Sequence, residues 1–164
     1  MTDSQARLEP LQSQLQQELH LTKQFLDVLQ EEAHILETGQ PNDLSRATSA
    51  KEKVAQALQS ATHERATLLG SFNIPNNLQG LRTVGSHVPE LAPLVEELGA
   101  LSEKAQRMNE QNGATINALL INTQRMMAAL QTLTGTSTVY DASGKKQAAP
   151  VAGDIPRLKP LKAG

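Results

Sequence analysis

The chain has 164 residues, a formal net charge of −2, no cysteine, no tryptophan and only 2% aromatic residues. This length suits a single domain, and so few aromatic side chains argue against a thick globular core. The absence of cysteine excludes a disulfide framework, the weakly acidic balance argues against a nucleic-acid-binding protein, and no apolar run is long enough for membrane insertion.

A first helix is expected from about residue 8 to residue 38. Pro10 fits only the first turn of a helix, and Gly39 with Pro41 should end it, because glycine supplies a left-handed cap and proline cannot continue the helix. Between these limits apolar residues recur at steps of three and four, which places them on one face. This stripe is Leu8, Leu11, Leu15, Leu19, Thr22, Leu26, Leu29, Ala33 and Leu36.

A second helix is expected over about residues 43 to 69, with Asn42 or Asp43 as its N-cap. The short Gly-Pro turn makes it pack antiparallel on the first helix. Its heptad stripe contains two charged residues, Lys51 and Arg65, whose stems can cover the seam while their charges reach water or a glutamate opposite. The alternative is a buried charge that specifies register. The stripe is Leu44, Ala47, Lys51, Val54, Leu58, Ala61, Arg65 and Leu68.

The connector from residue 70 to residue 88 contains a turn at Pro75-Asn76-Asn77 and a short helix that Gly85 should break. A third long helix should start at Pro89 and run to about residue 134, where Gly135 ends it.

The third helix is apolar on more than one face. A surface helix needs one stripe to dock on its own domain, so a second stripe implies either deep burial or a binding partner. Both stripes keep their phase across Asn112-Gly113, which favours a continuous helix although this dipeptide is common in turns. One stripe is Met108, Asn112, Thr115, Leu119, Met126 and Leu133, and the other is Ile116, Leu120, Thr123, Met127 and Leu130.

Residues 141–164 are rich in Gly, Ala, Pro and Lys and show no period, so we expect a flexible basic tail after a helical domain of residues 1–140. The predicted fold class is all-α: an elongated antiparallel three-helix bundle, made of a coiled-coil-like hairpin and a long third helix, with a disordered C-terminal tail.

Patterns that carry catalytic or metal chemistry are few. Glu31-x-x-His34 resembles half of a di-iron bundle motif, but no second copy occurs. Pairs such as Glu31-Glu32 and Glu96-Glu97 are interpreted as solvated helix faces. No nucleotide-binding loop, nucleophile elbow or zinc-protease motif is present. We therefore expect no enzyme, no cofactor and no metal site, with a metal-binding helical-bundle enzyme as the remote alternative.

The Asn109-x-x-Asn112-Gly113 step has two interpretations. An asparagine in a helix seam can fix register, and a glycine lets two backbones approach closely. The same residues can instead shape a groove for a partner. Physical arguments favour the first interpretation.

With its leucine heptads, its Asn109-x-x-Asn112-Gly113 step and its Tyr140-Asp141-x-x-Gly144 ending, the chain resembles the FlgN family of flagellar type III export chaperones. The resemblance covers about residues 8 to 146, and the tail beyond Lys146 has no counterpart. The succession of an Asn-x-x-Asn-Gly step, a helical run and a Tyr-Asp-x-x-Gly ending is more specific than the leucine heptads. The matching residues are Glu32 with Leu44, Lys51, Leu58, Arg65, Leu68 and Leu69, then Asn109 to Gly113, Ile116, Leu130, Leu133, Tyr140, Asp141 and Gly144.

The resemblance implies a cytoplasmic helical-bundle chaperone that binds the C-terminal helical segments of the hook-filament junction proteins FlgK and FlgL and delivers them to the export apparatus. One stripe of the third helix would hold the bundle and the other would meet the cargo, as amphipathic helices do in grooves. The flexible side chains of Met126 and Met127 suit such a surface. The partner-binding residues would be Asn109, Asn112, Gly113, Ile116, Leu120, Met127, Leu130 and Tyr140.

Without cargo, a bare groove of this kind favours self-association, as a homodimer or through a swapped helix. A generic coiled-coil adaptor, or another type III secretion chaperone, is the alternative. Such a protein would share the heptads and would need neither of the two specific motifs.

Overall fold

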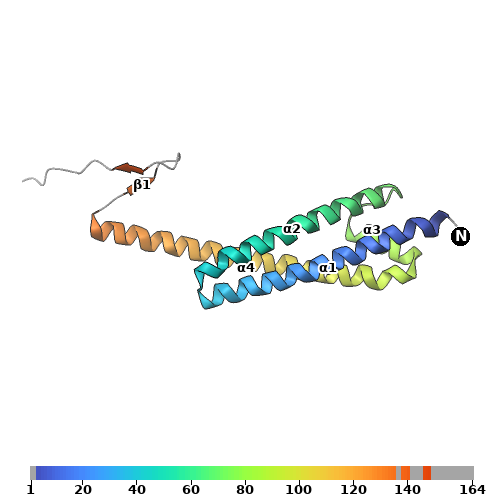
Figure 1. The fold of residues 1–164 in the computed structure, drawn as a ribbon, viewed down its shortest axis with the longest axis horizontal. Coiled ribbons are helices and arrows are strands. Elements are labelled where there is room, and N and C mark those ends of the chain that lie inside the picture. Colours follow the sequence, from blue (N-terminus) through green and yellow to red (C-terminus); the bar gives the residue numbers. More distant parts are fainter. Residues whose placement is uncertain (1–2, 136–137, 141–145, 149–164) are drawn as a thin grey trace, which may run out of the picture. The chain divides into compact units, whose positions relative to one another are not determined.

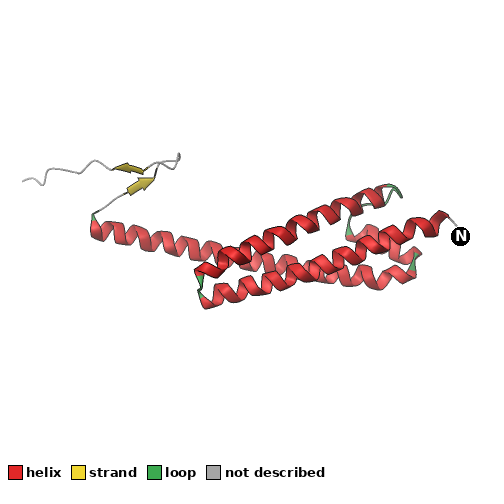
Figure 2. Cartoon of the chain, in the orientation of Figure 1, coloured by secondary structure: helices red, strands yellow, loops and turns green. Residues whose placement is uncertain are grey.

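The computed structural model describes residues 3–135, 138–140 and 146–148. Its helices are α1 (Asp3–Thr38), α2 (Pro41–Gly70), α3 (Leu78–His87) and α4 (Ala92–Thr134), and a short 3₁₀ helix, η1 (Pro89–Leu91), precedes α4 (Figure 1, Figure 2). The chain divides into two compact units, residues 1–118 and residues 119–164. The predicted all-α helical-bundle class is confirmed.

In the first unit, α1 and α2 form the predicted antiparallel hairpin. Gly39, in the turn between them, has a φ of +68°, which is the left-handed conformation expected of a glycine cap. The start of α2 differs from the prediction: Pro41 begins the helix and Gln40 is the N-cap, without a side-chain cap bond. Asn42 and Asp43 are therefore helical, because a proline is well suited to the first position of a helix.

Helix α1 begins earlier than the sequence predicted. It starts at Asp3, about two turns before Pro10, which lies inside the helix. The expectation that Pro10 marks the first turn is wrong. A proline removes one helical hydrogen bond and bends the chain, but it does not by itself end a helix whose following turns are well packed.

The connector holds a longer helix than predicted. Asn77 caps α3 by accepting a 2.8 Å hydrogen bond from the Gly80 amide. Gly85 was expected to break this helix, but it lies inside it and is buried. A Cβ at Gly85 would come within 3.1 Å of the Ala92 Cα. Gly85 therefore serves the close approach of α3 to the start of α4.

The core of the first unit consists of two apolar clusters. In one, Leu11 and Leu15 of α1 lie with Leu91 and Val95; in the other, Leu29 lies with Ala105. Early residues of α1 thus contact early residues of α4, so these two helices run in the same direction and α2 runs against both. The first cluster also contains Leu69, Leu81, Val84 and Leu98, and the second contains Leu26.

Helix α4 passes through Asn112-Gly113 without a break and ends before Gly135, whose φ is +68°. Both predictions are confirmed. In the second unit, β1 (Thr138–Tyr140) pairs antiparallel with β2 (Lys146–Ala148), where the sequence predicted no strand. The remainder of the predicted flexible tail, residues 141–145 and 149–164, lies outside the described residues.

Candidate partner-binding surface

One row of side chains recurs every seven residues, from Leu91 of η1 along the whole of α4. Its first four members are buried, with exposed fractions of 2% for Leu91, 3% for Leu98 and 5% each for Ala105 and Asn112. The last three are increasingly exposed: Leu119 at 46%, Met126 at 66% and Leu133 at 82%. The row that holds α4 in the bundle therefore continues as an exposed apolar row from Leu119 to Leu133.

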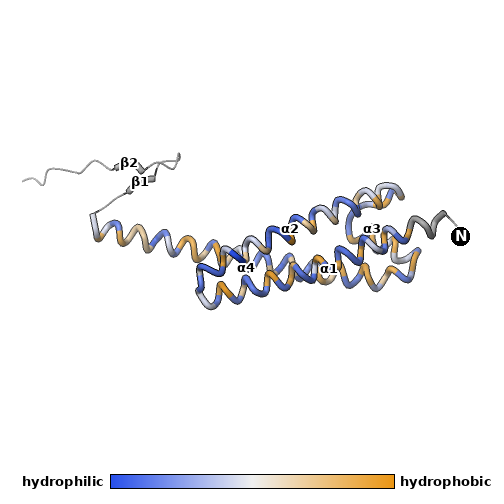
Figure 3. The backbone as a smooth tube through the Cα atoms, in the orientation of Figure 1, coloured by the Kyte–Doolittle hydropathy of each residue, from blue (hydrophilic) through white to orange (hydrophobic). Residues whose placement is uncertain are grey.

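The second predicted stripe adds to this surface. Leu120, Met127 and Leu130 are 54%, 53% and 50% exposed. With about 100° of rotation per residue, both stripes together cover an arc of roughly 140° on one side of the helix. We call this arc the α4 apolar face. Figure 3 shows that hydrophobic segments recur along the tube of α4. The α4 apolar face comprises Ile116, Leu119, Leu120, Met126, Met127, Leu130 and Leu133.

Exposed apolar residues are concentrated on this part of the chain. In residues 8–135, apart from Leu78, every exposed large hydrophobic side chain lies between Leu119 and Leu133. Only Ile121, which is 47% exposed, points away from the α4 apolar face, by about half a turn relative to Leu119. A cluster of this kind marks an interaction surface, whereas scattered surface leucines do not.

The sequence predicted that the stripe through Met108 holds the bundle and that only the other stripe is free. This holds as far as Asn112 and is wrong for Leu119, Met126 and Leu133, which are exposed. The reason is length. Helix α1 ends at Thr38, little more than two turns after Leu29, whereas α4 continues for about six turns after Asn112, which contacts Leu29.

Asn112 itself belongs to the bundle. Its side-chain amide donates 2.9 Å hydrogen bonds to the Leu29 carbonyl and to Oε2 of Glu32. The Glu32 side chain is 0% exposed, and its Oε1 accepts from Lys51 Nζ at 2.7 Å. Asn112, Glu32 and Lys51 thus join α4, α1 and α2 in one buried polar layer, as the register interpretation of the Asn-x-x-Asn-Gly step requires.

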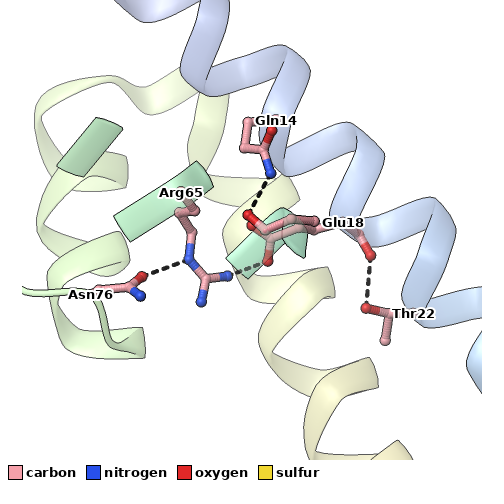
Figure 4. A network of polar contacts seen from close by, with 6 residues as sticks. Gln14, Glu18, Thr22, Arg65 and Asn76 are labelled. Atoms are coloured by element: carbon pink, nitrogen blue, oxygen red, sulfur yellow. Dashed lines mark hydrogen bonds and ion pairs between the residues drawn. The ribbon is translucent and has the colours of Figure 1, made fainter. Parts of the chain in front are cut away.

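A second buried polar layer lies between the two apolar clusters. Figure 4 shows its polar contacts. Glu18 of α1 accepts from Arg65 Nη1 of α2, and Arg65 Nε donates to Asn76 Oδ1 at 2.8 Å. Oε1 of Glu18 has no hydrogen-bond partner in the described part of the chain. Burial raises the pKa of the Glu18 carboxyl above its usual value, and the nearby Arg65 guanidinium opposes this shift only in part.

These layers explain why Lys51 and Arg65 lie on an otherwise apolar stripe: both charges meet a glutamate opposite, as the first interpretation predicted. The expectation that Glu32 lies on a solvated face is wrong, because it faces Lys51 across the hairpin. The sequence does contain a signal for these two ion pairs. Glu18 and Glu32 are two heptads apart, and so are Lys51 and Arg65, which is the spacing that antiparallel pairing demands.

The other predicted site residues lie in different surroundings. Asn109 is exposed, and Ile116 is half-buried. Gly113 has no atom within 4 Å of the position of an added Cβ, so close backbone approach does not explain it. Tyr140 is the last residue of β1, and its side chain lies outside the described part.

In the described residues no three His, Asp or Glu side chains gather as a metal site requires. None of the helices in this part combines the length and the hydropathy that a membrane crossing requires.

The fold and this surface define an all-α bundle protein with an apolar helix face that is exposed in the part of the chain that the structure describes. A family model described as FlgN protein matches residues 1–148, and the chain belongs to the FlgN family. This is a family of flagellar export chaperones and not of enzymes. A crystal structure of a candidate flagella synthesis protein FlgN from Pseudomonas aeruginosa, at 1.48 Å resolution, is similar, with 27% identity and a TM-score of 0.59. The similarity covers 71% of this chain and 91% of that one. No curated protein matches in sequence.

Proposed function

We propose that this protein is a cytoplasmic chaperone for FlgK- and FlgL-type hook-associated proteins. It binds their C-terminal helical segments, prevents their premature assembly and delivers them to the flagellar export apparatus. Its family supports a flagellar role. The observation that carries the cargo assignment is the α4 apolar face, whose heptad row passes from 5% exposed at Asn112 to 82% exposed at Leu133.

The mode of binding follows from this row. An apolar face wider than about 100° needs a packing partner, and in the first unit that partner is the α1–α2 hairpin. Beyond Asn112 an amphipathic cargo helix can occupy the same kind of position. The thioethers of Met126 and Met127 then allow two different cargo segments to pack on one face.

The test compares two side chains of equal exposure on opposite sides of α4. Leu119→Ala removes an apolar group from the α4 apolar face, and Ile121→Ala removes one from outside it; these residues are 46% and 47% exposed. Calorimetric binding of the FlgK and FlgL C-terminal segments should weaken by more than about 1 kcal/mol for Leu119→Ala, and similarly for Leu120→Ala and Met127→Ala if they are anchors. Ile121→Ala should bind as the wild type does.

A buried control separates folding from binding. Leu98→Ala should lower the free energy of unfolding by about 2 to 5 kcal/mol, whereas none of the α4-face variants should approach this loss. Equal weakening by Leu119→Ala and Ile121→Ala would exclude this face as the site. If neither cargo segment binds the wild type, the chaperone assignment to FlgK and FlgL fails.

A further inference from the structure

The exposed half of α4 is almost without charge. Between Gln111 and Thr134 the single charged residue is Arg125. At about 100° per residue, Arg125 lies on the side of the helix opposite the α4 apolar face. The positions that border this face are occupied by amides, such as Asn122 on one side and Gln131 on the other.

The packed half of the same helix is different. It carries several charges, and two of them make ion pairs with other helices of the first unit. Glu97 of α4 pairs with Lys23 of α1 at 2.8 Å, and Glu96 pairs with Arg82 of α3 at 2.9 Å. The bundle therefore uses charges beside its apolar seam, and the exposed continuation of that seam does not.

We propose that the α4 apolar face recognises an amphipathic helix bordered by uncharged residues, and that it does so without ion pairs. The continuing heptad row identifies the occupant as a helix packed in the manner of the bundle. Border charges normally fix register and choose partners. A partner helix with amide, hydroxyl or alanine borders matches the α4 borders, while one with many border charges would find no counter-charge. This inference rests on the proposed function and adds the chemistry of the segment bound.

Salt dependence follows directly. Exposed ion pairs are screened as the Debye length falls from about 10 Å at 0.1 M salt to about 3 Å at 1 M. Apolar packing is not weakened in this way. Binding of the FlgK C-terminal segment, used as a synthetic peptide, should therefore change its Kd by less than about twofold between about 0.1 M and about 1 M sodium chloride.

Two matched double variants test the borders of the partner. Asn122→Lys with Gln131→Lys places positive charges beside the face, and Asn122→Glu with Gln131→Glu places negative ones there. Both pairs occupy positions that are exposed or half-exposed, so circular dichroism should show unchanged helix content. With an uncharged partner border, the two variants should bind the peptide with Kd values within about threefold of each other, because neither sign meets a counter-charge.

The outcomes separate the two proposals. Opposite changes in Kd for the lysine and glutamate variants, or a tenfold change with salt, would overturn the inference. The chaperone role would still stand if Leu119→Ala weakens binding and Ile121→Ala does not. If the wild-type protein does not bind the peptide at either salt concentration, the chaperone role is overturned, and this inference with it. A second copy of the chain is the competing occupant. Sedimentation showing a dimer that the peptide does not dissociate would also overturn the inference.

Discussion

Asn112 and Asn109 have the same side chain on the same helix, in one short motif, but opposite surroundings. Asn112 is buried and donates to Glu32 and to the Leu29 carbonyl, whereas Asn109 is exposed. Replacing each by alanine therefore separates a buried hydrogen-bonding role from an effect of helix propensity, since the propensity change is the same.

The contacts of Asn112 determine how much stability its replacement should cost. In Asn112→Ala the Glu32 carboxylate, which is 0% exposed, keeps Lys51 on Oε1 and loses its donor on Oε2. A hydrogen bond to a charged group contributes about 1.5 to 3 kcal/mol, and a buried group left without a partner costs about as much. The Leu29 carbonyl retains its helical bond. We expect Asn112→Ala to lower the free energy of unfolding by about 2 to 3 kcal/mol.

Asn109→Ala is the control. Alanine is the better helix former by a few tenths of a kcal/mol, so this variant should be unchanged or slightly more stable. Urea unfolding followed by circular dichroism at 222 nm measures both. If the two variants lose equal stability, the buried layer contributes nothing measurable and our account of Asn112 is refuted. Cargo binding adds a second readout: Asn112→Ala should retain it wherever the variant is folded.

Four further outcomes are expected. Gly80→Ala should destabilise the protein in thermal melts by more than about 1 kcal/mol, because the added Cβ would lie 2.0 Å from the Pro75 carbonyl oxygen. Gly113→Ala places its Cβ in open space and should stabilise the protein by up to about 1 kcal/mol. The pKa of Glu18 is raised in the folded protein, so folding favours its protonated form. The free energy of unfolding of the wild type, relative to that of Glu18→Gln, should therefore fall as pH rises above the usual carboxyl pKa of 4.5. If this free energy rises instead, the direction of the pKa shift is wrong. Truncation after Gly144 should leave the melting temperature of the helices unchanged, and a drop of many degrees would show that the tail is docked. Without cargo, sedimentation should show a homodimer that Leu119→Ala weakens.

The sequence was sufficient for the main elements because their limits depend on local chemistry. Gly39 and Gly135 end helices through a left-handed backbone that glycine adopts easily, and both have a φ of +68°. The prediction that the first helix starts near Pro10 was wrong because the effect of a proline depends on packing further along the helix. Gly85 misled for the same kind of reason: a glycine can break a helix or allow close approach, and only the position of Ala92 decides between them.

The candidate site was predictable in composition but not in extent. Heptad spacing identifies which α4 residues share a face, and Leu120, Met127 and Leu130 of the predicted partner-binding set are exposed. It cannot tell where the covering helices end. That limit depends on the register between α1 and α4, which is set by Asn112 against Glu32, a contact between residues far apart in the chain. Without this register, Leu119 and Leu98 are equivalent members of one row.

The two polar layers and the α4 apolar face are connected by the requirement for a single register. A purely apolar seam of leucines allows helices to slide by a heptad, because each shifted packing is similar in energy. A one-heptad slip of α4 would remove the Asn112 donor from the buried Glu32 carboxylate, at a cost of about 2 to 3 kcal/mol. It would also change which members of the heptad row are buried in the first unit. The buried Asn112, Glu32 and Lys51 layer thus fixes both the packing of the first unit and the residues that α4 presents to a partner.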